Sequence, residues 1–479
     1  MTAAVVLGGV GLISGLALTA LWAGTAAALS LLGLTLIVLV MVLRRFGAVD
    51  LLLVACLLVL VVPARYRIEE LGAAGTPAAL IGMLTFGMWA LGVALNRPWL
   101  ARQRHPLRWG LLAVTLSVLV SYVAAGFRPH DALEARAGDR GILTLIGMLG
   151  LALLTADALQ DRRSLRRLVQ VVVAAGAVVA SLGILQFQTG TDIASVIRLP
   201  GFSYLPQAYN DERSGFVRIV STTSHPIELS VVLAVMFPLA LWLAFTSSER
   251  SRRWWWLATA LVAAAIPMTV SRTGVLGLVV ALAVMLPGWQ WRRRIQVLAM
   301  GALGLVAMRL VIPGLLGTLQ SFLFSPGEDP SLLSRETARG TAVDLFGDRP
   351  ILGRGFGTFL PERYAFLDNQ VLLSAVETGI FGVLALGLLV GIAVALAFGV
   401  RRMAPRISGS TDRDLALALL AGLAVSVSTW FTYDALSFPT SRSLTFVVLG
   451  CIAALWRVVR NENETPALER GKLHEATQV

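Results

Sequence analysis

Long apolar runs separated by short polar segments recur along almost the whole chain. A helix needs about 20 apolar residues to cross the roughly 30 Å hydrocarbon core of a membrane. The pattern therefore predicts an all-α polytopic membrane protein with about 12–14 transmembrane helices. The expected spans are 4–23, 26–43, 47–63, 77–95, 108–126, 141–158, 167–187, 226–245, 255–271, 274–288, 295–312, 370–399, 414–431 and 440–457.

The start of the chain leaves the exact count open, because residues 4–43 form either two full spans or a shorter hairpin. Residues 1–24 carry no cleavage-site pattern after a short apolar core. We therefore expect a retained first span and not a signal peptide.

The composition excludes an ordinary soluble domain. The 479 residues are 56% hydrophobic and 14% charged, with a mean hydropathy of +0.76, whereas about a quarter of the residues in a soluble domain are charged. The net charge of +12 comes from arginines in short clusters between the spans. A nucleic-acid partner would need a basic stripe on one face, so we expect none.

The arginines also predict the orientation of the chain. One set of alternate loops is short, rich in arginine and nearly free of acids, as is typical of cytoplasmic loops. The other set is longer and mixes acids with arginines, so we assign it to the external face and both termini to the cytoplasm. The first set comprises 44–45, 97–108, 162–167, 250–253, 292–294 and 401–406, and the second comprises 64–76, 127–140, 188–224, 313–369 and 432–439.

The longest polar interruption, residues 313–369, is expected to form one wall of an active site on the external face. Loops of this length are uncommon unless they have a function. The chain then divides into an N-terminal transmembrane bundle (1–187), a core that includes this loop (188–457) and a cytoplasmic tail expected to be disordered (458–479). Within the loop, residues 332–346 suggest a helix.

Two details of the spans bear on the site. Residues 368–399 would form a straight helix of about 48 Å, which exceeds the membrane core, so we expect a break at Gly379 with residues 368–378 at or above the outer surface. The sequence Ser271-Arg272-Thr273-Gly274 separates two spans with almost no loop. It holds Arg272 at the outer mouth, where a charge costs less than at mid-membrane.

Cations outnumber acids among the candidate residues on the external face. A guanidinium group matches phosphate oxygens with a planar fork and stays charged at any relevant pH, so converging arginines favour a phosphate-bearing lipid. Arg272 and Arg335 are the main candidates, and Arg339 lies one helical turn after Arg335. If these arginines have no role in substrate binding, Arg272 is an interfacial anchor. Arg335 and Arg339 then form ion pairs on a solvated helix.

A glycine-rich segment, Gly353-Arg354-Gly355-Phe356-Gly357, follows Pro350. Glycines allow a sharp turn and a close approach of the backbone to a ligand, so the segment either brings Arg354 to a substrate or forms a plain turn. It is not a dinucleotide fingerprint, because no strand precedes it and no helix with the right third glycine follows it.

Asp368 and Asn369 open the long apolar run after the loop. Both residue types are favoured helix N-caps, which is one interpretation of the pair. In the other interpretation Asp368 is a general base for the proton of a sugar hydroxyl, kept ionised by a neighbouring arginine, with Asn369 in the substrate site. Glu377 lies nine residues further on and is expected to support the site.

Four further polar residues complete the candidate substrate site. His225 opens a span after Arg218, and Glu228 follows it, where a carboxylate facing lipid would be costly. Asp434 either caps the last outer turn or lines the site. The external face has no Asp-x-Asp pair and no His/Cys cluster that suits zinc, so we expect neither a metal nor a cofactor.

The order of these motifs resembles the O-antigen ligase/polymerase family of bacterial integral-membrane glycosyltransferases. The likeness covers residues 215–455, about half of the chain. The matching pieces are His225-Pro226, Ser271-Arg272-Thr273-Gly274, Ser334-Arg335, Asp348-Arg349-Pro350-Ile351-Leu352-Gly353-Arg354-Gly355-Phe356-Gly357, Asp368-Asn369-Gln370, Glu377-Thr378-Gly379, Tyr433-Asp434 and Phe438-Pro439.

The resemblance implies a GT-C-like helical fold in the bacterial cytoplasmic membrane. It also implies metal-independent, inverting transfer of a glycan from a polyprenyl (undecaprenyl) diphosphate carrier to a glycan acceptor on the external face. Arg272 and Arg335 match the arginines that engage the donor diphosphate. The family has a histidine before an asparagine where this chain has Asp368, and that histidine is typical of ligases, so we favour a polysaccharide repeat-unit polymerase.

Three alternatives stay open at this stage. One is an O-antigen-type ligase that acts on a lipid or wall acceptor. Another is a polysaccharide or lipid transporter (flippase), although transporters usually carry two related halves and ionisable residues near mid-membrane, and the sequence shows no internal repeat. The third is a membrane scaffold without chemistry.

Overall fold

The computed structural model describes residues 47–101, 105–197, 199–205, 212–213, 215–318, 330–364, 366–404 and 411–476. Side chains are described in these ranges except at residues 193, 212–213, 330–335 and 465–476. The predicted spans 4–23 and 26–43 lie outside the described residues.

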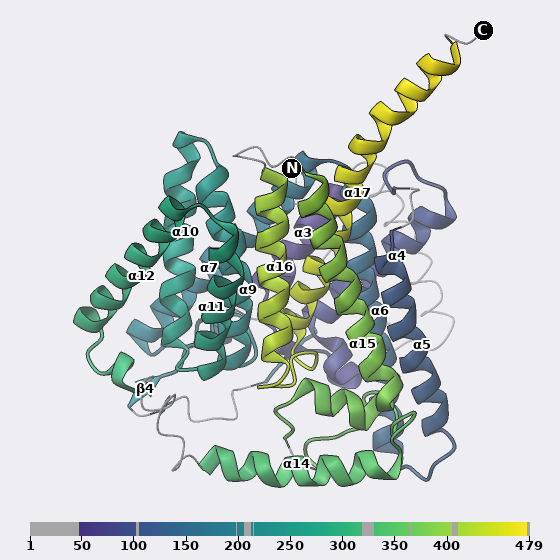
Figure 1. The fold of residues 1–479 in the computed structure, drawn as a ribbon. Coiled ribbons are helices and arrows are strands. Elements are labelled where there is room, and N and C mark those ends of the chain that lie inside the picture. The colour runs from purple at the N-terminus through teal and green to yellow at the C-terminus, as the bar shows by residue number, and fades with distance from the viewer. Residues whose placement is uncertain are drawn as a thin grey trace.

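Helices make up most of the described chain (Figure 1). They are α3 (Ala48–Val61), η1 (Glu69–Gly75), α4 (Pro77–Ala94), α5 (Leu107–Ala125), α6 (Ala132–Ala158), α7 (Arg162–Thr189), α8 (Ile193–Val196), α9 (Pro226–Thr246), α10 (Glu249–Met268), α11 (Arg272–Met285), η2 (Leu286–Gly288), α12 (Trp291–Val311), α14 (Pro330–Asp348), α15 (Gln370–Met403), α16 (Thr411–Thr429) and α17 (Pro439–Ala476). Every span predicted from residue 47 onwards coincides with one of them.

The predicted fold class is confirmed. Eight of the described helices are long and apolar enough to cross a membrane, so the chain is an all-α polytopic membrane protein. Strands are limited, in the described residues, to two short antiparallel pairs. β1 (Tyr66–Arg67) pairs with β2 (Ser203–Tyr204), and β3 (Glu212–Arg213) pairs with β4 (Phe216–Val217).

The core of the bundle lies around α6, α9 and α17. The apolar windows of these helices are 83%, 89% and 94% buried, whereas that of α12 is only 6% buried, and α12 leans away from the other helices in Figure 1. Small residues permit close helix packing, as is common in membranes. A Cβ atom on Gly150 in α6 would lie 2.4 Å from the carbonyl oxygen of Gly82 in α4.

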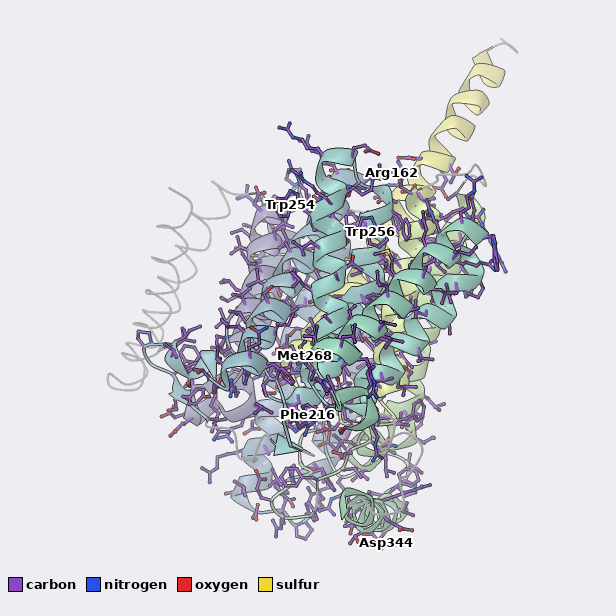
Figure 2. The ribbon with its side chains drawn as sticks, turned by 90° about the vertical axis from the view of Figure 1, so that its left-hand side faces the viewer. Arg162, Phe216, Trp254, Trp256, Met268 and Asp344 are labelled. Carbon is purple, nitrogen blue, oxygen red and sulfur yellow. The ribbon has the colours of Figure 1, made fainter. Side chains whose placement is uncertain are left out.

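The two predicted sets of loops gather at opposite ends of the bundle. At the arginine-rich end, Arg162 forms ion pairs with Asp412 (2.7 Å) and with Glu462, and Arg293 pairs with Asp414 at 2.7 Å. Helix α14 lies across the other end (Figure 1), and Arg162 and Asp344 mark the two ends in Figure 2. The helices therefore alternate in direction as the loop composition predicted, and the side of the membrane that each end faces stays a prediction.

The C-terminal segment differs from the prediction of a disordered tail. Helix α17 continues to Ala476 and projects beyond the bundle (Figure 1). Arg460 and Glu464 form an ion pair one helical turn apart at 2.6 Å, which supports a helix. Good helix formers such as Ala467 and Leu468 follow, so the helix continues after the apolar run has ended.

Candidate active site

The predicted break in α15 is present at Gly379. This residue has φ 65° and ψ −167° in the middle of the helix, a backbone conformation that favours glycine. The break leaves main-chain groups without their usual partners within the helix. The N–H of Ile380 donates instead to the carbonyl of Pro350 at 2.9 Å.

The glycine-rich loop completes this break. The main-chain N–H groups of Arg354 and Gly355 donate to the carbonyls of Val376 and Glu377, both at 2.9 Å. A Cβ atom on Gly353 would lie 2.3 Å from the carbonyl oxygen of Glu377. The glycines of this loop are therefore required for its close approach to the α15 backbone, and the interpretation as a turn is the one that the structure supports.

The side chain of Arg354 is engaged by other protein groups. Its Nη2 donates to the Tyr364 hydroxyl at 2.5 Å and lies 3.7 Å from Glu134 Oε1, and its guanidinium group stacks 4.7 Å from the centre of the Tyr364 ring. Arg128 pairs with the other oxygen of Glu134 at 2.6 Å. Arg354 thus belongs to an ion cluster that fastens the loop to α6, and its contact with a substrate stays a prediction.

Glu134 is a residue that the sequence analysis missed. It is buried in the first turn of α6, and its carboxylate accepts a 2.6 Å hydrogen bond from Tyr364. Burial of a carboxylate requires such partners. A signal was available, since an acid in the first turn after the favoured N-cap Asp131 is expected at a helix start, but the distant partners could not be inferred from it.

Asn369 is the N-cap of α15. Its Oδ1 accepts from the N–H of Leu372 at 2.9 Å. The next residue, Gln370, donates its main-chain N–H to the carbonyl of Trp430 at 2.7 Å and accepts from the N–H of Leu436 at 2.7 Å. Asp368 is therefore not the helix cap, and it lies partly buried where α15 meets the 430–438 turn.

Asp434 lies in this turn, close to other carboxylates. Burial, and then the negative charges of Asp368 and Glu228, raise the pKa of Asp434 to about 7, although a hydrogen bond with Ser437 opposes the shift. Asp434 is also among the charged groups that act on Glu377, whose carboxylate accepts from the N–H of Phe359 at 3.3 Å. Asp434 thus interacts electrostatically with three other predicted residues, Asp368, Glu228 and Glu377.

His225 and Glu228 stabilise the start of α9. His225 is its N-cap, with Nδ1 accepting from the N–H of Ile227 at 3.1 Å. Burial and the nearby charge of Arg218 lower the pKa of His225 to about 4. Glu228 is fully buried, and its carboxylate accepts from the N–H groups of Thr440 and Ser441 in α17 at 2.7 and 3.2 Å. Both residues support the site by joining α9 to its surroundings.

Arg272 begins α11 directly after a tight turn. Val270 in this turn has a left-handed φ of 49°, which a non-glycine residue rarely adopts. The carbonyl of Thr269 accepts from Arg218 Nε at 3.2 Å. A Cβ atom on Gly274 would lie 2.5 Å from Ser230 Cβ, so this glycine permits α11 to pack against α9, and the turn brings Arg272 and Arg218 to the same end of the bundle.

Helix α14 confirms the helix suggested within the long loop. Ala338 and Ala342 are buried and pack with Val376 and Leu373 of α15. Arg339 is exposed. The side chain of Arg335 lies outside the described residues. The structure therefore does not bring Arg339 toward the other candidates.

Arg218 and the carboxylates of Asp368 and Asp434 lie around the 430–438 turn. The ring of His225, near Arg218, lies 5.9 Å from that of Phe438, and Phe438 lies 5.4 Å from the ring of Tyr433. Asp434 directly follows Tyr433 in this turn, and the charge of Asp368 acts on it. Within the part of the chain that the structure describes, no group of three or more His, Cys, Asp or Glu side chains could hold a metal ion.

Comparison with known proteins finds a family model that matches part of the chain. A family model described as O-antigen ligase matches residues 257–387, the segment that contains Arg272, α14, the glycine-rich loop and the break in α15. No curated protein matches the chain in sequence. A solved chain titled "Structural coordination of polymerization and crosslinking by a peptidoglycan synthase complex" is similar at 19% identity, covering 74% of this chain and 97% of that chain, with a TM-score of 0.38.

A TM-score of 0.38 is too low for this likeness to support an inference about the protein. The family match does not depend on it. The matched segment contains Arg272, Arg335, Asp368 and Glu377, whereas His225 and Asp434 lie outside it. The chain is thus an integral membrane protein, and its residues 257–387 are similar to the O-antigen ligase family.

Proposed function

We propose that the protein transfers a glycan from a polyprenyl diphosphate carrier to a glycan acceptor at the end of the bundle covered by α14. The acceptor hydroxyl oxygen attacks the anomeric carbon of the donor sugar, and the bond from that carbon to the diphosphate oxygen breaks. Polyprenyl diphosphate leaves with the bonding electrons, and the configuration of the anomeric carbon is inverted. The reaction requires no metal, and the end at which it takes place is external.

In this proposal Arg272 and Arg335 hold the donor diphosphate. They offset the negative charge that grows on the leaving group, which is the kind of electrostatic stabilisation that contributes most to many enzymes. Arg218 adds positive charge beside Arg272. Arg354 has a supporting role, because Glu134 and Tyr364 engage its side chain.

Asp368 accepts the proton of the attacking hydroxyl. The observation that supports this role is the place of Asp368, which lies partly buried directly before the cap residue Asn369 and whose charge acts on Asp434 in the neighbouring turn. Asp434 and Glu377 are near enough to share the acidic region, where they would contact the sugar hydroxyls. A repeat-unit polymerase is favoured over a ligase, because a carboxylate stands where ligases have a histidine.

The test uses purified protein in nanodiscs with a synthetic polyprenyl diphosphate oligosaccharide and EDTA. Wild type, Asp368→Asn and the matched control Asp344→Asn, which removes an exposed carboxylate on α14, are compared by product length and by released polyprenyl diphosphate. We expect wild type and Asp344→Asn to lengthen the glycan and Asp368→Asn to lose about 10²-fold or more in rate.

The outcomes separate the alternatives. A ladder of products supports a polymerase, and a single transfer to an added lipid or wall acceptor supports a ligase. Equal turnover by Asp368→Asn would remove the base from the mechanism. If wild type transfers no glycan but moves the lipid across vesicles, the protein is a transporter, and the proposed function fails.

A further inference from the structure

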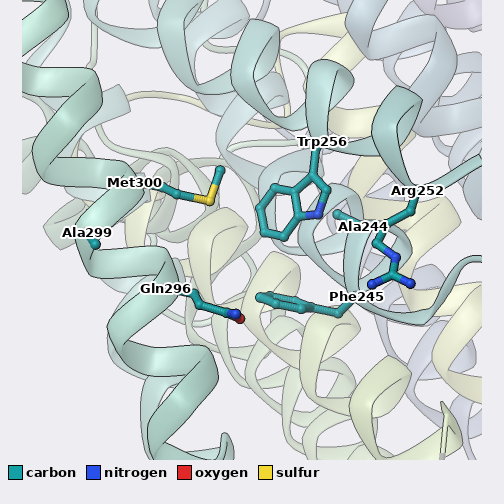
Figure 3. A pocket seen from close by; sticks show the side chains of 7 residues that line it. All are labelled: Ala244, Phe245, Arg252, Trp256, Gln296, Ala299 and Met300. Atoms are coloured by element: carbon teal, nitrogen blue, oxygen red, sulfur yellow. The ribbon is translucent and has the colours of Figure 1, made fainter. Parts of the chain in front are cut away.

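A cavity of about 460 Å³ lies at the arginine-rich end of the bundle, opposite the proposed active site. Helices α9, α10 and α12 line it, and Figure 3 shows Met300 and Gln296 of α12 reaching toward Trp256 and Phe245. Its full lining is Ala244, Phe245, Arg252, Trp256, Gln296, Ala299 and Met300. The cavity is large enough for part of a lipid-sized ligand.

One wall of the cavity, α12, has few contacts with the rest of the bundle. Val297 is the buried residue of this helix, and Leu298, Leu303 and Leu310 are 52%, 69% and 75% exposed. In a membrane such a helix is surrounded by lipid. The space between α12 and α10 is therefore open to lipid from the side.

Aromatic residues show the depth of the cavity. Trp254 and Trp291 are exposed near the starts of α10 and α12, and tryptophans are enriched where headgroups meet the hydrocarbon core. Gln296 and Met300 lie about 8 and 14 Å along α12 from Trp291. The cavity thus runs from headgroup level into the hydrocarbon region.

The chemistry of the lining changes along this direction. At headgroup level the guanidinium group of Arg252 pairs with Glu249, whose side chain is 91% exposed, and exposed ion pairs contribute little. The Nε atom of Arg252 is buried and has no hydrogen-bond partner among the described residues. Beside it, Phe245 and Trp256 meet edge to face at 5.1 Å and form an apolar wall with Met300.

We propose that this cavity binds an anionic glycerophospholipid. Its phosphate contacts Arg252, which can exchange the exposed Glu249 for a phosphate oxygen, and the upper part of an acyl chain lies against Phe245, Trp256 and Met300. A free phosphate would leave the apolar wall unused. Phosphatidylcholine also carries a phosphate, but its ammonium group would bring positive charge beside Arg252 and beside Arg293, whose guanidinium group lies 5.1 Å from the centre of the Phe245 ring. Basic pockets between helices are a recurring way to bind acidic headgroups.

The proposal does not rest on glycan transfer, so binding is the readout. Full-length protein in nanodiscs with equal phosphatidylglycerol and phosphatidylcholine is extracted with mild detergent, and the retained lipids are identified by native mass spectrometry. We expect wild type to retain one phosphatidylglycerol. Arg252→Gln should lower this retention at least fivefold, and the exposed matched control Arg250→Gln should leave it unchanged.

A second pair of variants tests the apolar part without changing charge. Met300→Trp fills the cavity and should abolish retention, while Met300→Leu should preserve it. Equal retention of the two lipids by wild type would overturn the proposal. So would equal losses in Arg252→Gln and Arg250→Gln, or full retention in Met300→Trp. The melting temperature of each arginine and methionine variant is measured as well, so that a folding defect is distinguished from a loss of lipid binding.

Discussion

The main-chain N–H of Gly355 donates a 2.9 Å hydrogen bond to the carbonyl of Glu377. This bond fastens a loop outside the membrane to the broken turn of a transmembrane helix. The hydroxyl of Ser121 in α5 donates to the same carbonyl at 2.6 Å. A break in α15, a glycine-rich loop and a neighbouring helix thus form one unit, and the first half of α15, which begins after Asp368, is held in place by it.

This unit predicts a strong effect of Gly379→Ala. The residue has a left-handed backbone, which costs an alanine about 1–2 kcal/mol, and a Cβ atom would lie 2.2 Å from the carbonyl oxygen of Ile351. We expect a loss of at least about 2 kcal/mol in unfolding free energy together with loss of transfer. Gly387→Ala is the control, because it lies in the same helix with nothing within 4 Å of its Cβ position. Thermal unfolding in nanodiscs measures both, and similar melting temperatures for the two variants would contradict the role of the break.

Removal of the Glu134 carboxylate should release the glycine-rich loop. Glu134→Gln leaves the largely buried Arg128 and Arg354 without their acid, and loss of one partner of a buried ion pair costs about 3–5 kcal/mol. Hydrogen exchange should rise in residues 350–364. Asp139→Asn changes an exposed carboxylate on the same helix and should cost less than about 0.5 kcal/mol. Unchanged exchange in Glu134→Gln would show that the loop is held by its backbone alone.

The donor clamp predicts a graded loss at Arg272. Arg272→Ala should lower the transfer rate by about 10²–10³-fold, and Arg272→Lys should recover part of it, since lysine keeps the charge but not the planar fork. Arg309→Ala, an exposed position in the last turn of α12, is the matched control. The initial transfer rate is measured at saturating donor for each variant. A wild-type rate in Arg272→Ala would show that Arg272 does not hold the donor diphosphate.

Asp434 gives a pH dependence with a defined sign. Burial and the charges of Asp368 and Glu228 raise the pKa of Asp434 from 3.8 to about 7. Between these values the folded protein keeps a proton that the unfolded chain releases, so this contribution to stability is complete below about pH 4 and is lost as the pH rises to about 7. Asp434→Asn cannot ionise at this position. The difference between its melting temperature and that of wild type should therefore rise between pH 4 and 7 and stay constant above pH 7.

The control for this titration is Asp344→Asn, which removes an exposed carboxylate at the same end. Its melting temperature should follow that of wild type at every pH. If Asp434→Asn followed wild type in the same way, Asp434 would carry no stability linked to proton binding.

Each span predicted from residue 47 onwards corresponds to a helix of the structure, although α6 begins before its predicted start and α17 continues past its predicted end. Spans are predictable because the membrane requires an apolar run of a set length, which is a local property of the chain. The break at Gly379 followed from the same length argument. The continuation of α17 beyond residue 457 was not predicted.

The partners of the polar residues were decided by the tertiary structure alone. No spacing in the chain shows that Arg354 meets Glu134, 220 positions away in the sequence, or that Glu228 caps α17. Asp368 and Asn369 are adjacent and both suit a helix cap, and the orientation of α15 against the 430–438 turn gave that role to Asn369. Periodicity is a property of neighbours along the chain, whereas ion pairs and caps depend on which helix ends meet in space.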